Sequence, residues 1–343
     1  MKRIIILFIL LFLISGMAFC QGQVLSEFHD NINQKAEGVR FPKSEILNPI
    51  MIACTSHVIA LSDIFKPTFL SLYDYSTESF LGHYLQKGMG PDDVSMMTTF
   101  KSHGDEFYFW DINKHALSFV KADAPDHIAR SISFTKAHPN LQKVYKISEV
   151  KSMATGAFPG YPFAILDNNG DSITKFFGVY PYEDCNNKLT DKDKANQCSW
   201  YIHYEPSKMK MVAATLSGEF ITFYDMKDLN SPTLIKKKGN LLPVYNGSRV
   251  SPDNVYSFID VTGNSRYCIA LYWGKTDKKY PHKDLFGGSK LLIYDWDGNP
   301  IKSIQLDHIY IGIAAAPNSG KVFLVRKDNE RRSFVVESVG IKY

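Results

Sequence analysis

The sequence predicts an all-β protein, a single six-bladed β-propeller whose ring is closed by an N-terminal strand. Stretches with an apolar period of 3.6 residues are scarce, so few helices are expected. Short runs rich in Val, Ile, Phe, Tyr and Thr alternate with Gly, Asn, Asp and Pro, which is typical of strands and turns. The runs fall into six sets of three or four, spaced by roughly 40 to 50 residues, as propeller blades are.

The first five sets account for most of the chain. Strands are expected at 57–61, 68–73 and 79–85; at 96–100, 106–110, 116–120 and 128–134; at 144–150, 162–166 and 172–177; at 200–204, 209–214, 219–224 and 233–236; and at 255–261, 267–272, 291–294 and 301–306. Each run ends at turn-forming residues, and acidic residues such as Asp74 and Asp295 recur there.

The sixth set, at 310–315, 322–325 and 333–339, lacks a fourth strand. The segment 24–41 has no blade of its own. If that segment supplies the missing strand, the ring closes and no sheet edge stays open. A β-sandwich followed by a second β domain is the alternative, but no linker rich in Pro, Gly or Ser marks a boundary.

Residues 1–20 are expected to be a signal peptide, and 21–343 a single propeller domain. A positively charged start, an apolar run over 4–14 and small residues after it have the order of an export signal. Cleavage is expected before Gln21. Alternatively Cys20 carries a lipid anchor, although Phe19 stands where lipoproteins usually have a small residue. The expected location is therefore the periplasm or cell envelope.

Charge balance, the length of the apolar runs and the cysteines limit the kinds of partner and environment that the sequence predicts. The 39 basic and 35 acidic residues nearly balance, so nucleic acid is not an expected partner. No later run approaches about 20 apolar residues, so no transmembrane segment is expected once the signal is removed. Cys185 and Cys198 flank a polar loop and form a candidate disulfide in an oxidising compartment. Cys54 and Cys268 lie in apolar strands and are expected to be buried thiols.

A glycine-containing segment follows the first set: Gln86-Lys87-Gly88-Met89-Gly90-Pro91-Asp92-Asp93. It is not expected to cradle phosphate, because a strand rather than a helix follows it. A tight turn between blades, with glycine at positive φ, is expected instead.

With the export signal and the six units, this segment resembles the TolB-like six-bladed propeller proteins of Bacteroides-type bacteria. Those proteins often carry a Gly-x-Gly-Pro-Gly-Glu/Asp loop after the first blade. Gly88, Gly90, Pro91 and Asp93 match this loop, whereas Asp92 replaces its third glycine and Val94 replaces a frequent aromatic residue. The family is largely uncharacterised, so the resemblance implies a fold rather than an activity.

Propeller topology predicts where a site would lie. Loops between blades share a face with loops that join second and third strands, and ligand sites commonly occupy that face. Two long segments, 179–197 and 274–289, are expected there as a lid or as surface excursions. His203 is expected to line the channel. The ligand-binding candidates are Asp63, Asp111, His115, Asp167, Asn169 and His308, all expected on that same face, together with Trp200, His203 and Trp273.

Two classes of function remain open. The first is a binding module that presents a polar and aromatic mouth to a glycan, a peptide or an envelope protein. The alternative is a metal-dependent hydrolase or lyase of the lactonase type, in which carboxylates and imidazoles at the channel hold Ca²⁺ or Zn²⁺. The sequence contains no recognised catalytic motif, so it does not establish whether the protein is an enzyme.

Overall fold

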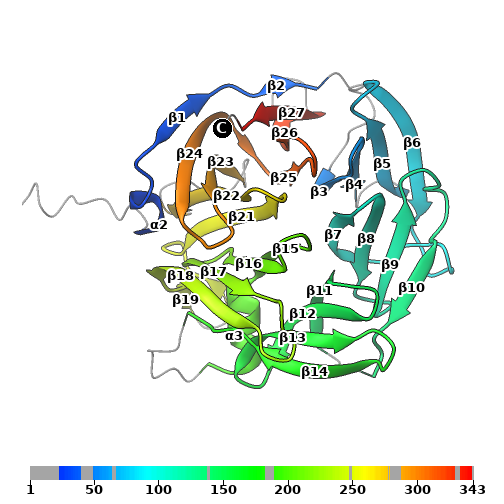
Figure 1. The fold of residues 1–343 in the computed structure, drawn as a ribbon, viewed down its shortest axis with the longest axis horizontal. Helices are drawn as coiled ribbons and strands as arrows, with labels where there is room; N and C mark the ends of the chain where they lie inside the picture. The colour runs from blue at the N-terminus through cyan, green and yellow to red at the C-terminus, as the bar shows by residue number, and fades with distance from the viewer. Residues whose placement is uncertain are drawn as a thin grey trace, which may run out of the picture.

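The computed structural model describes residues 23–39, 49–63, 67–136, 140–181, 189–246, 249–276, 278, 287–328 and 333–341 of the 343-residue chain. Six sheets stand around a central axis and extend outward from it as blades (Figure 1). The predicted six-bladed β-propeller is therefore confirmed.

Each blade begins with its innermost strand and proceeds outward in chain order. The first three blades are β3 (Pro49–Cys54), β4 (Val58–Asp63), β5 (Thr68–Asp74) and β6 (Ser79–Gln86); β7 (Met97–His103), β8 (Glu106–Asp111), β9 (Ala116–Lys121) and β10 (Arg130–Ser133); and β11 (Leu141–Lys146), β12 (Lys151–Phe158), β13 (Tyr161–Asp167) and β14 (Ser172–Phe177). The last three are β15 (Trp200–Glu205), β16 (Lys210–Thr215), β17 (Glu219–Asp225) and β18 (Thr233–Leu241); β21 (Val255–Gly263), β22 (Cys268–Thr276), β23 (Gly288–Tyr294) and β24 (Pro300–Tyr310); and β25 (Gly312–Ala315), β26 (Lys321–Asp328) and β27 (Ser333–Gly340).

The N-terminal segment closes the ring, as predicted. β2 (Glu37–Gly38) pairs antiparallel with β27 and becomes the fourth strand of the sixth blade. β1 (Asn31–Gln34) adds a fifth, parallel strand to the blade before it, beside β24 (Figure 1). The short helix α2 (Gln23–Ser26) precedes them, and the ring of Phe28 packs edge-on against that of Tyr294 at 5.1 Å. One segment therefore covers the outer edges of two blades.

The hydrophobic core consists of layers between neighbouring blades. Successive side chains of a strand point to opposite faces of its sheet. On β5, for example, Leu70 and Leu72 pack toward the second blade, whereas Tyr73 packs toward the sixth. Six clusters of buried residues fill the six interfaces in this way. Inner and middle strands are buried on both faces, which explains their nearly continuous apolar runs.

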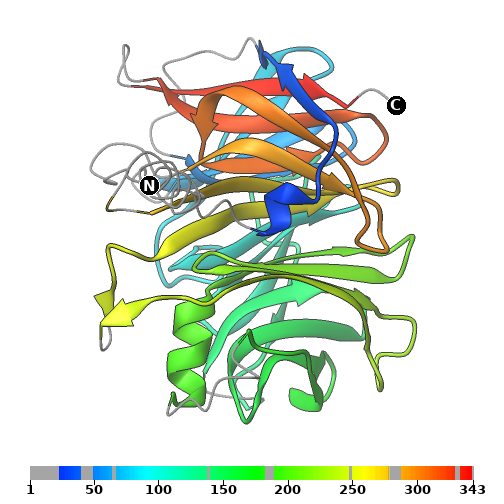
Figure 2. The same cartoon turned by 90° about the vertical axis from the view of Figure 1, so that its left-hand side faces the viewer.

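The two faces of the ring carry different loops. The front face, turned to the viewer in Figure 1, carries the loops that join first to second and third to fourth strands. The back face carries the loops between blades and those joining second to third strands. The helix α3 (Asp191–Cys198) and the hairpin of β19 (Tyr245–Asn246) and β20 (Arg249–Val250) project from the back face, at the left of Figure 2. All front-face loops lie within the described residues.

Two blade strands among the described residues were not predicted. β3 was missing from the first set, and 144–150 was expected to be one strand, whereas β11 ends at Lys146 and β12 begins at Lys151. β12 reads Lys-Ser-Met-Ala-Thr-Gly-Ala-Phe, which contains small residues of low strand propensity. Its packing between β11 and β13 outweighs that propensity. The missed strand reverses the face assigned to every later turn of the third blade.

Candidate functional site

The inner strands line the central channel with every second residue, because alternate side chains face the axis. β7 contributes Lys101 and His103, and β15 contributes Tyr201 and His203. The strands run from the back face to the front face. The earlier residue of each strand therefore lies nearer the back, and the later one nearer the front.

An ion pair lies between the two ends of the channel. Lys101 Nζ is 3.1 Å from Asp260 Oδ1 and donates a second hydrogen bond to the carbonyl of Val261 at 2.9 Å. Asp260 Oδ2 also accepts the backbone N–H of Ile313 at 3.2 Å. Both side chains are mostly buried, at 16% and 14% exposed. Lys101 lines a cavity on each side, so we name the two cavities the front chamber and the back chamber.

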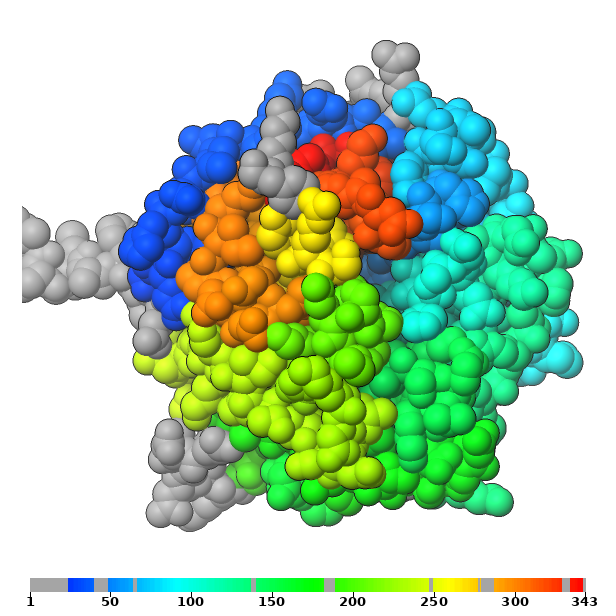
Figure 3. Space-filling model, viewed as in Figure 1, coloured from blue at the N-terminus to red at the C-terminus, as the bar shows by residue number. Residues whose placement is uncertain are grey.

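The front chamber is the larger cavity, with a volume of about 380 Å³, and it opens through the loops that end the inner strands. Figure 3 shows this face of the molecule, which is hollowed near its centre. Polar and apolar groups line it in about equal measure, and the polar side chains include Ser102, His103, His203, Tyr204, Asn264 and Asn318. A second hollow of about 360 Å³ adjoins it beside Arg266 and shares Asn264 and Asn318 with it.

Two half-buried histidines face the front chamber. The ring of His203 stacks on that of Trp296 at 5.9 Å, and its Nε2 is buried without a hydrogen-bond partner among the described residues. Burial lowers the pKa of His203 to about 3, and the charge of Lys101 adds to this effect. Burial, with the nearby Lys146 ammonium, also lowers the pKa of His103. Both rings are therefore neutral at pH 7.

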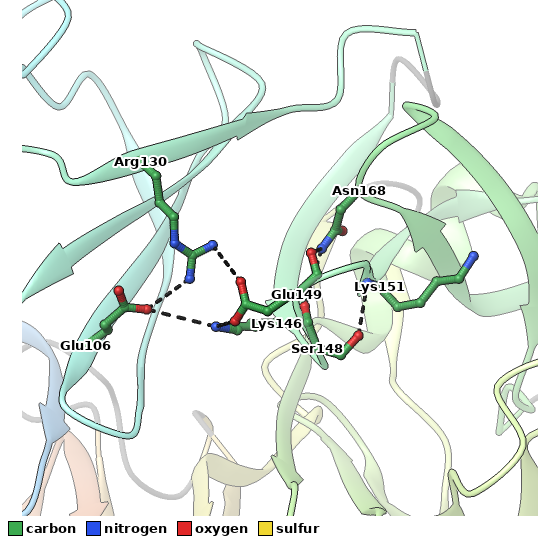
Figure 4. Close-up of polar contacts among 7 residues, drawn as sticks. All are labelled: Glu106, Arg130, Lys146, Ser148, Glu149, Lys151 and Asn168. Carbon is green, nitrogen blue, oxygen red and sulfur yellow. Dashed lines mark hydrogen bonds and ion pairs between the residues drawn. The ribbon is translucent and has the colours of Figure 1, made fainter.

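A network of charges fixes one wall of this chamber (Figure 4). The buried Lys146 ammonium is bound by Glu149 and lies 3.9 Å from Glu106. Arg130 reaches the same two carboxylates at 2.9 and 3.4 Å and lies 3.6 Å above the ring of Phe119. The network joins the second and third blades. The charge of Lys146 is therefore neutralised by glutamates that stabilise this wall of the chamber.

The back chamber is smaller, about 270 Å³, and different in character. Apolar side chains stand at its opening on the back face: Ile50, Met51, Met97 and Ile311. Lys101, Asp260, Lys143, Tyr145 and Tyr201 line its inner part. At the front end of the channel, the chamber is lined by lysines that are paired with acidic side chains. At the back end, the chamber is amphipathic.

The structure does not bring the predicted ligand-binding candidates together. Among them, His203 lines a chamber, as expected. Trp200 is buried in the layer between the third and fourth blades, 5.0 Å from the ring of Phe163, and Trp273 is buried between the fifth and sixth. His308 lies half exposed on the outer strand β24, away from the axis.

Other candidates on the back face have structural roles. The buried carboxylate of Asp111 accepts the backbone N–H groups of Ser95 at 2.7 Å and Asn113 at 3.1 Å, which fixes the turn after β8. His115 follows in the same turn with φ of 49° and its ring edge-on to Trp110. Asp63 is buried at the end of β4.

The predicted back-face position of Asp167 and Asn169 was wrong. Because β12 is a strand, their turn joins the third and fourth strands of its blade and lies on the front face. Asp167 accepts the backbone N–H of Asn169 at 2.9 Å and of Gly170 at 3.2 Å. These bonds lower the pKa of Asp167 and identify it as a turn-forming residue.

The glycine segment after the first blade forms a tight loop between blades. Asp93 Oδ2 accepts the backbone N–H of Gly90 at 2.8 Å. A Cβ on Gly88 would meet that oxygen at 2.3 Å, and one on Gly90 at 2.7 Å. The expected positive φ is absent at both glycines, so space rather than backbone conformation requires them. Lys114 Nζ donates to the carbonyls of Gly90 and Asp93, which ties the loop to the second blade.

The proposed disulfide stays a prediction. Cys198 ends α3, is buried and forms no disulfide with another described cysteine, whereas Cys185 lies outside the described residues. Cys54 and Cys268 are buried thiols, as expected. Residues 1–22, with the signal peptide and Cys20, also lie outside the described ranges, as do parts of the two predicted lid segments.

No group of three His, Cys, Asp or Glu side chains that could hold a metal ion occurs in the described ranges. Of the carboxylates expected to converge on the channel, Asp111 and Asp167 instead fix turns. The described ranges also contain no helix long and apolar enough to cross a membrane.

Four channel residues were missed: Lys101, His103, Lys143 and Asp260. A signal for them was present, because a charged residue inside an apolar strand is rarely buried without a partner. Lys101 and Asp260 stand within such strands. Their pairing could not be predicted, since 159 positions separate them.

These features define the class of protein: a closed propeller of six blades with a divided central channel. Within that class, the chain matches the TolB-like 6-blade propeller-like family over residues 27–316 and belongs to that family.

Solved structures from Bacteroides are similar in fold. A member of the DUF4221 family from Bacteroides vulgatus has a TM-score of 0.57 and 10% identity, covering 90% of this chain and 98% of its own. A candidate exported protein from Bacteroides fragilis also has a TM-score of 0.57, with 9% identity, covering 91% and 99%. At these identities the likeness shows the fold alone. A comparison with curated proteins gives no match.

Proposed function

We propose that this protein is an exported binding module that takes a polar, uncharged ligand, a glycan fragment, into the front chamber. The observation that carries the proposal is that His203 lines a cavity of 380 Å³, while the Nε2 of its ring is buried without a partner among the described residues. Buried polar atoms in proteins are nearly always hydrogen-bonded, so an unpaired imidazole nitrogen beside a roomy cavity favours a ligand contact.

The charge balance favours an uncharged ligand. Lys101 is paired with Asp260, and Lys146 with Glu149. Glu205 accepts the backbone N–H and hydroxyl of Ser207 in its own turn. What remains is a set of neutral imidazoles, hydroxyls and amides, together with the partly buried ring of Tyr204. Sugar hydroxyls both donate and accept hydrogen bonds, which suits such a lining.

Export is part of the same proposal. The first twenty residues have the pattern of a signal peptide, and a relative in fold from Bacteroides fragilis bears the name of a candidate exported protein. We propose the periplasm or cell envelope as the destination. Fractionation of cells that make the full-length chain, and mass measurement of the mature N-terminus, would test both the destination and the cleavage before Gln21.

The binding test compares two histidines. A thermal-shift panel of neutral oligosaccharides, acidic oligosaccharides and short peptides would be followed by calorimetric titration of the hits. His203→Phe keeps an aromatic ring on Trp296 but removes the nitrogen, whereas His308→Phe changes an exposed outer position. We expect a neutral oligosaccharide to bind the wild type and His308→Phe equally, and His203→Phe at least about tenfold more weakly.

Two results would contradict the proposal. One is binding of the hits to His203→Phe with unchanged affinity, which would place the site elsewhere. The other is binding of acidic oligosaccharides or peptides alone, which would show that the charge balance was read wrongly.

A further inference from the structure

The back chamber contains a cation that pairs with no carboxylate in the described part of the chain. Lys143 Nζ donates one hydrogen bond, to the carbonyl of Trp200 at 2.7 Å, and lies 4.3 Å from the centre of the Tyr201 ring. It makes no ion pair with any described carboxylate, although a lysine ammonium has three N–H donors. This differs from Lys101 and Lys146, which are both paired with acids.

The other polar groups of the back chamber do not supply the missing charge. Asp260 is occupied by Lys101 and by the backbone N–H groups of Val261 and Ile313. Burial raises the pKa of Tyr145 and of Tyr201, so both phenols are neutral. Lys101 and Asp260 offset one another, and Lys143 provides the remaining charge facing the cavity.

The opening of the same chamber is apolar. Ile50 and Met51 at the start of β3, Met97 at the start of β7, and Ile311 before β25 line it. Methionine side chains adapt to irregular apolar partners. A ligand that satisfies both regions has a negative end for Lys143 and an apolar body for the opening.

We propose that the back chamber binds a small amphiphilic carboxylate, with its carboxylate on the Lys143 ammonium and its apolar chain along Ile50, Met51 and Met97. This site lies on the opposite side of the Lys101–Asp260 pair from the front chamber. It is therefore independent of the glycan proposal, and either can fail without the other.

Because the carboxylate binds to the charged form of Lys143, its affinity should depend on pH. Burial lowers the pKa of Lys143 to about 8, with the carboxylate of Asp260 opposing the shift and Lys101 adding to it. The ammonium is charged in roughly nine molecules of ten at pH 7 and in about one of ten at pH 9. A carboxylate that requires the charged form should therefore bind about tenfold more weakly at pH 9 than at pH 7.

The test uses hexanoate, with hexanol as the uncharged probe of equal chain length, titrated by calorimetry at pH 7 and pH 9. N-acetyl-leucyl-leucine is titrated beside them. Tighter binding of hexanoate would indicate a free fatty acid, and tighter binding of the dipeptide would indicate a peptide C-terminus. Lys143→Met should weaken carboxylate binding by about 10- to 100-fold. Lys175→Met, on the exposed outer strand β14, is the matched control and should have no effect.

Lys143→Arg separates charge from folding. Arginine stays charged at pH 9, so this variant should bind hexanoate with nearly the same affinity at both pH values. Three results would each overturn the proposal: hexanol binding as tightly as hexanoate, a tenfold loss at pH 9 that persists in Lys143→Arg, or no binding of either carboxylate to the wild type.

Discussion

The two chambers of the channel are lined by opposite ends of the inner strands, and they differ in how their charged side chains are paired. At the front, Lys146 is held by glutamates and two histidines are kept neutral by burial. At the back, Lys143 has no acidic partner among the described residues and stands below an apolar opening. The position of a residue along an inner strand therefore determines which chamber it lines and which charged groups lie beside it.

The largest expected loss of unfolding free energy comes from removing the Lys101–Asp260 ion pair, which lies between the two chambers. Asp260→Ala leaves the mostly buried Lys101 without a counter-ion and the N–H of Ile313 without an acceptor. Truncating one partner of a buried pair costs about 3 kcal/mol of unfolding free energy. Urea denaturation measures this loss.

The matched control is Asp253→Ala. Its carboxylate pairs with Lys278 on the surface, where the side chains are 63% and 73% exposed, so the change should cost less than about 1 kcal/mol. Equal losses for the two variants would mean that the central pair does not stabilise the wall between the chambers.

Lowering the pH is expected to reduce the free energy of unfolding by a smaller amount, through His203 in the front chamber. The pKa of His203 is about 3 in the folded protein and near 6.5 in the unfolded chain. Below pH 6.5 the unfolded chain binds a proton that the folded protein excludes, so the free energy of unfolding falls as the pH falls from 6.5 toward 3. Between pH 7 and pH 5 we expect a loss of about 2 kcal/mol from this residue.

His203→Phe should remove that part of the pH dependence while keeping the stack on Trp296. His308→Phe should leave it in place. A pH profile of unfolding that His203→Phe does not flatten would show that this imidazole is not held neutral in the chamber.

The smallest expected loss of unfolding free energy comes from a change in the loop that joins the first two blades on the back face. Gly88→Ala would place a Cβ against the Asp93 carboxylate, which must then shift away from the N–H of Gly90. Overpacking of this kind costs about 1 to 2 kcal/mol. Gly38→Ala is the control, because no atom of the described residues lies within 4 Å of its Cβ position. If both alanines unfold at the same urea concentration, the loop is less tightly packed than we describe.

The sequence predicted the arrangement of the blades better than it predicted the site. Blade number, closure by the segment before β3 and the channel position of His203 follow from strand runs and their spacing. β12 was missed because its Ala and Gly residues have low strand propensity, and that omission moved Asp167 and Asn169 to the wrong face. One undetected strand reverses the assignment of each turn after it within the blade.

The chamber residues were harder to predict for a different reason. Asp111 and Asp167 look like ligand groups because they are acidic residues at strand ends, yet both bind backbone N–H groups of their own turns. Lys101 and Asp260 look like ordinary strand residues, and they meet because the ring brings distant inner strands together. A single sequence gives the two-residue alternation of a strand but not which strands lie opposite one another.

The most direct test of the front chamber as the binding site is a ¹⁵N NMR titration of histidine-labelled protein with the neutral oligosaccharide that binds best. We expect the side-chain nitrogen resonances of His203 and His103 to shift with saturation while that of His308 stays fixed. Saturable binding that leaves His203 and His103 unchanged would contradict the account.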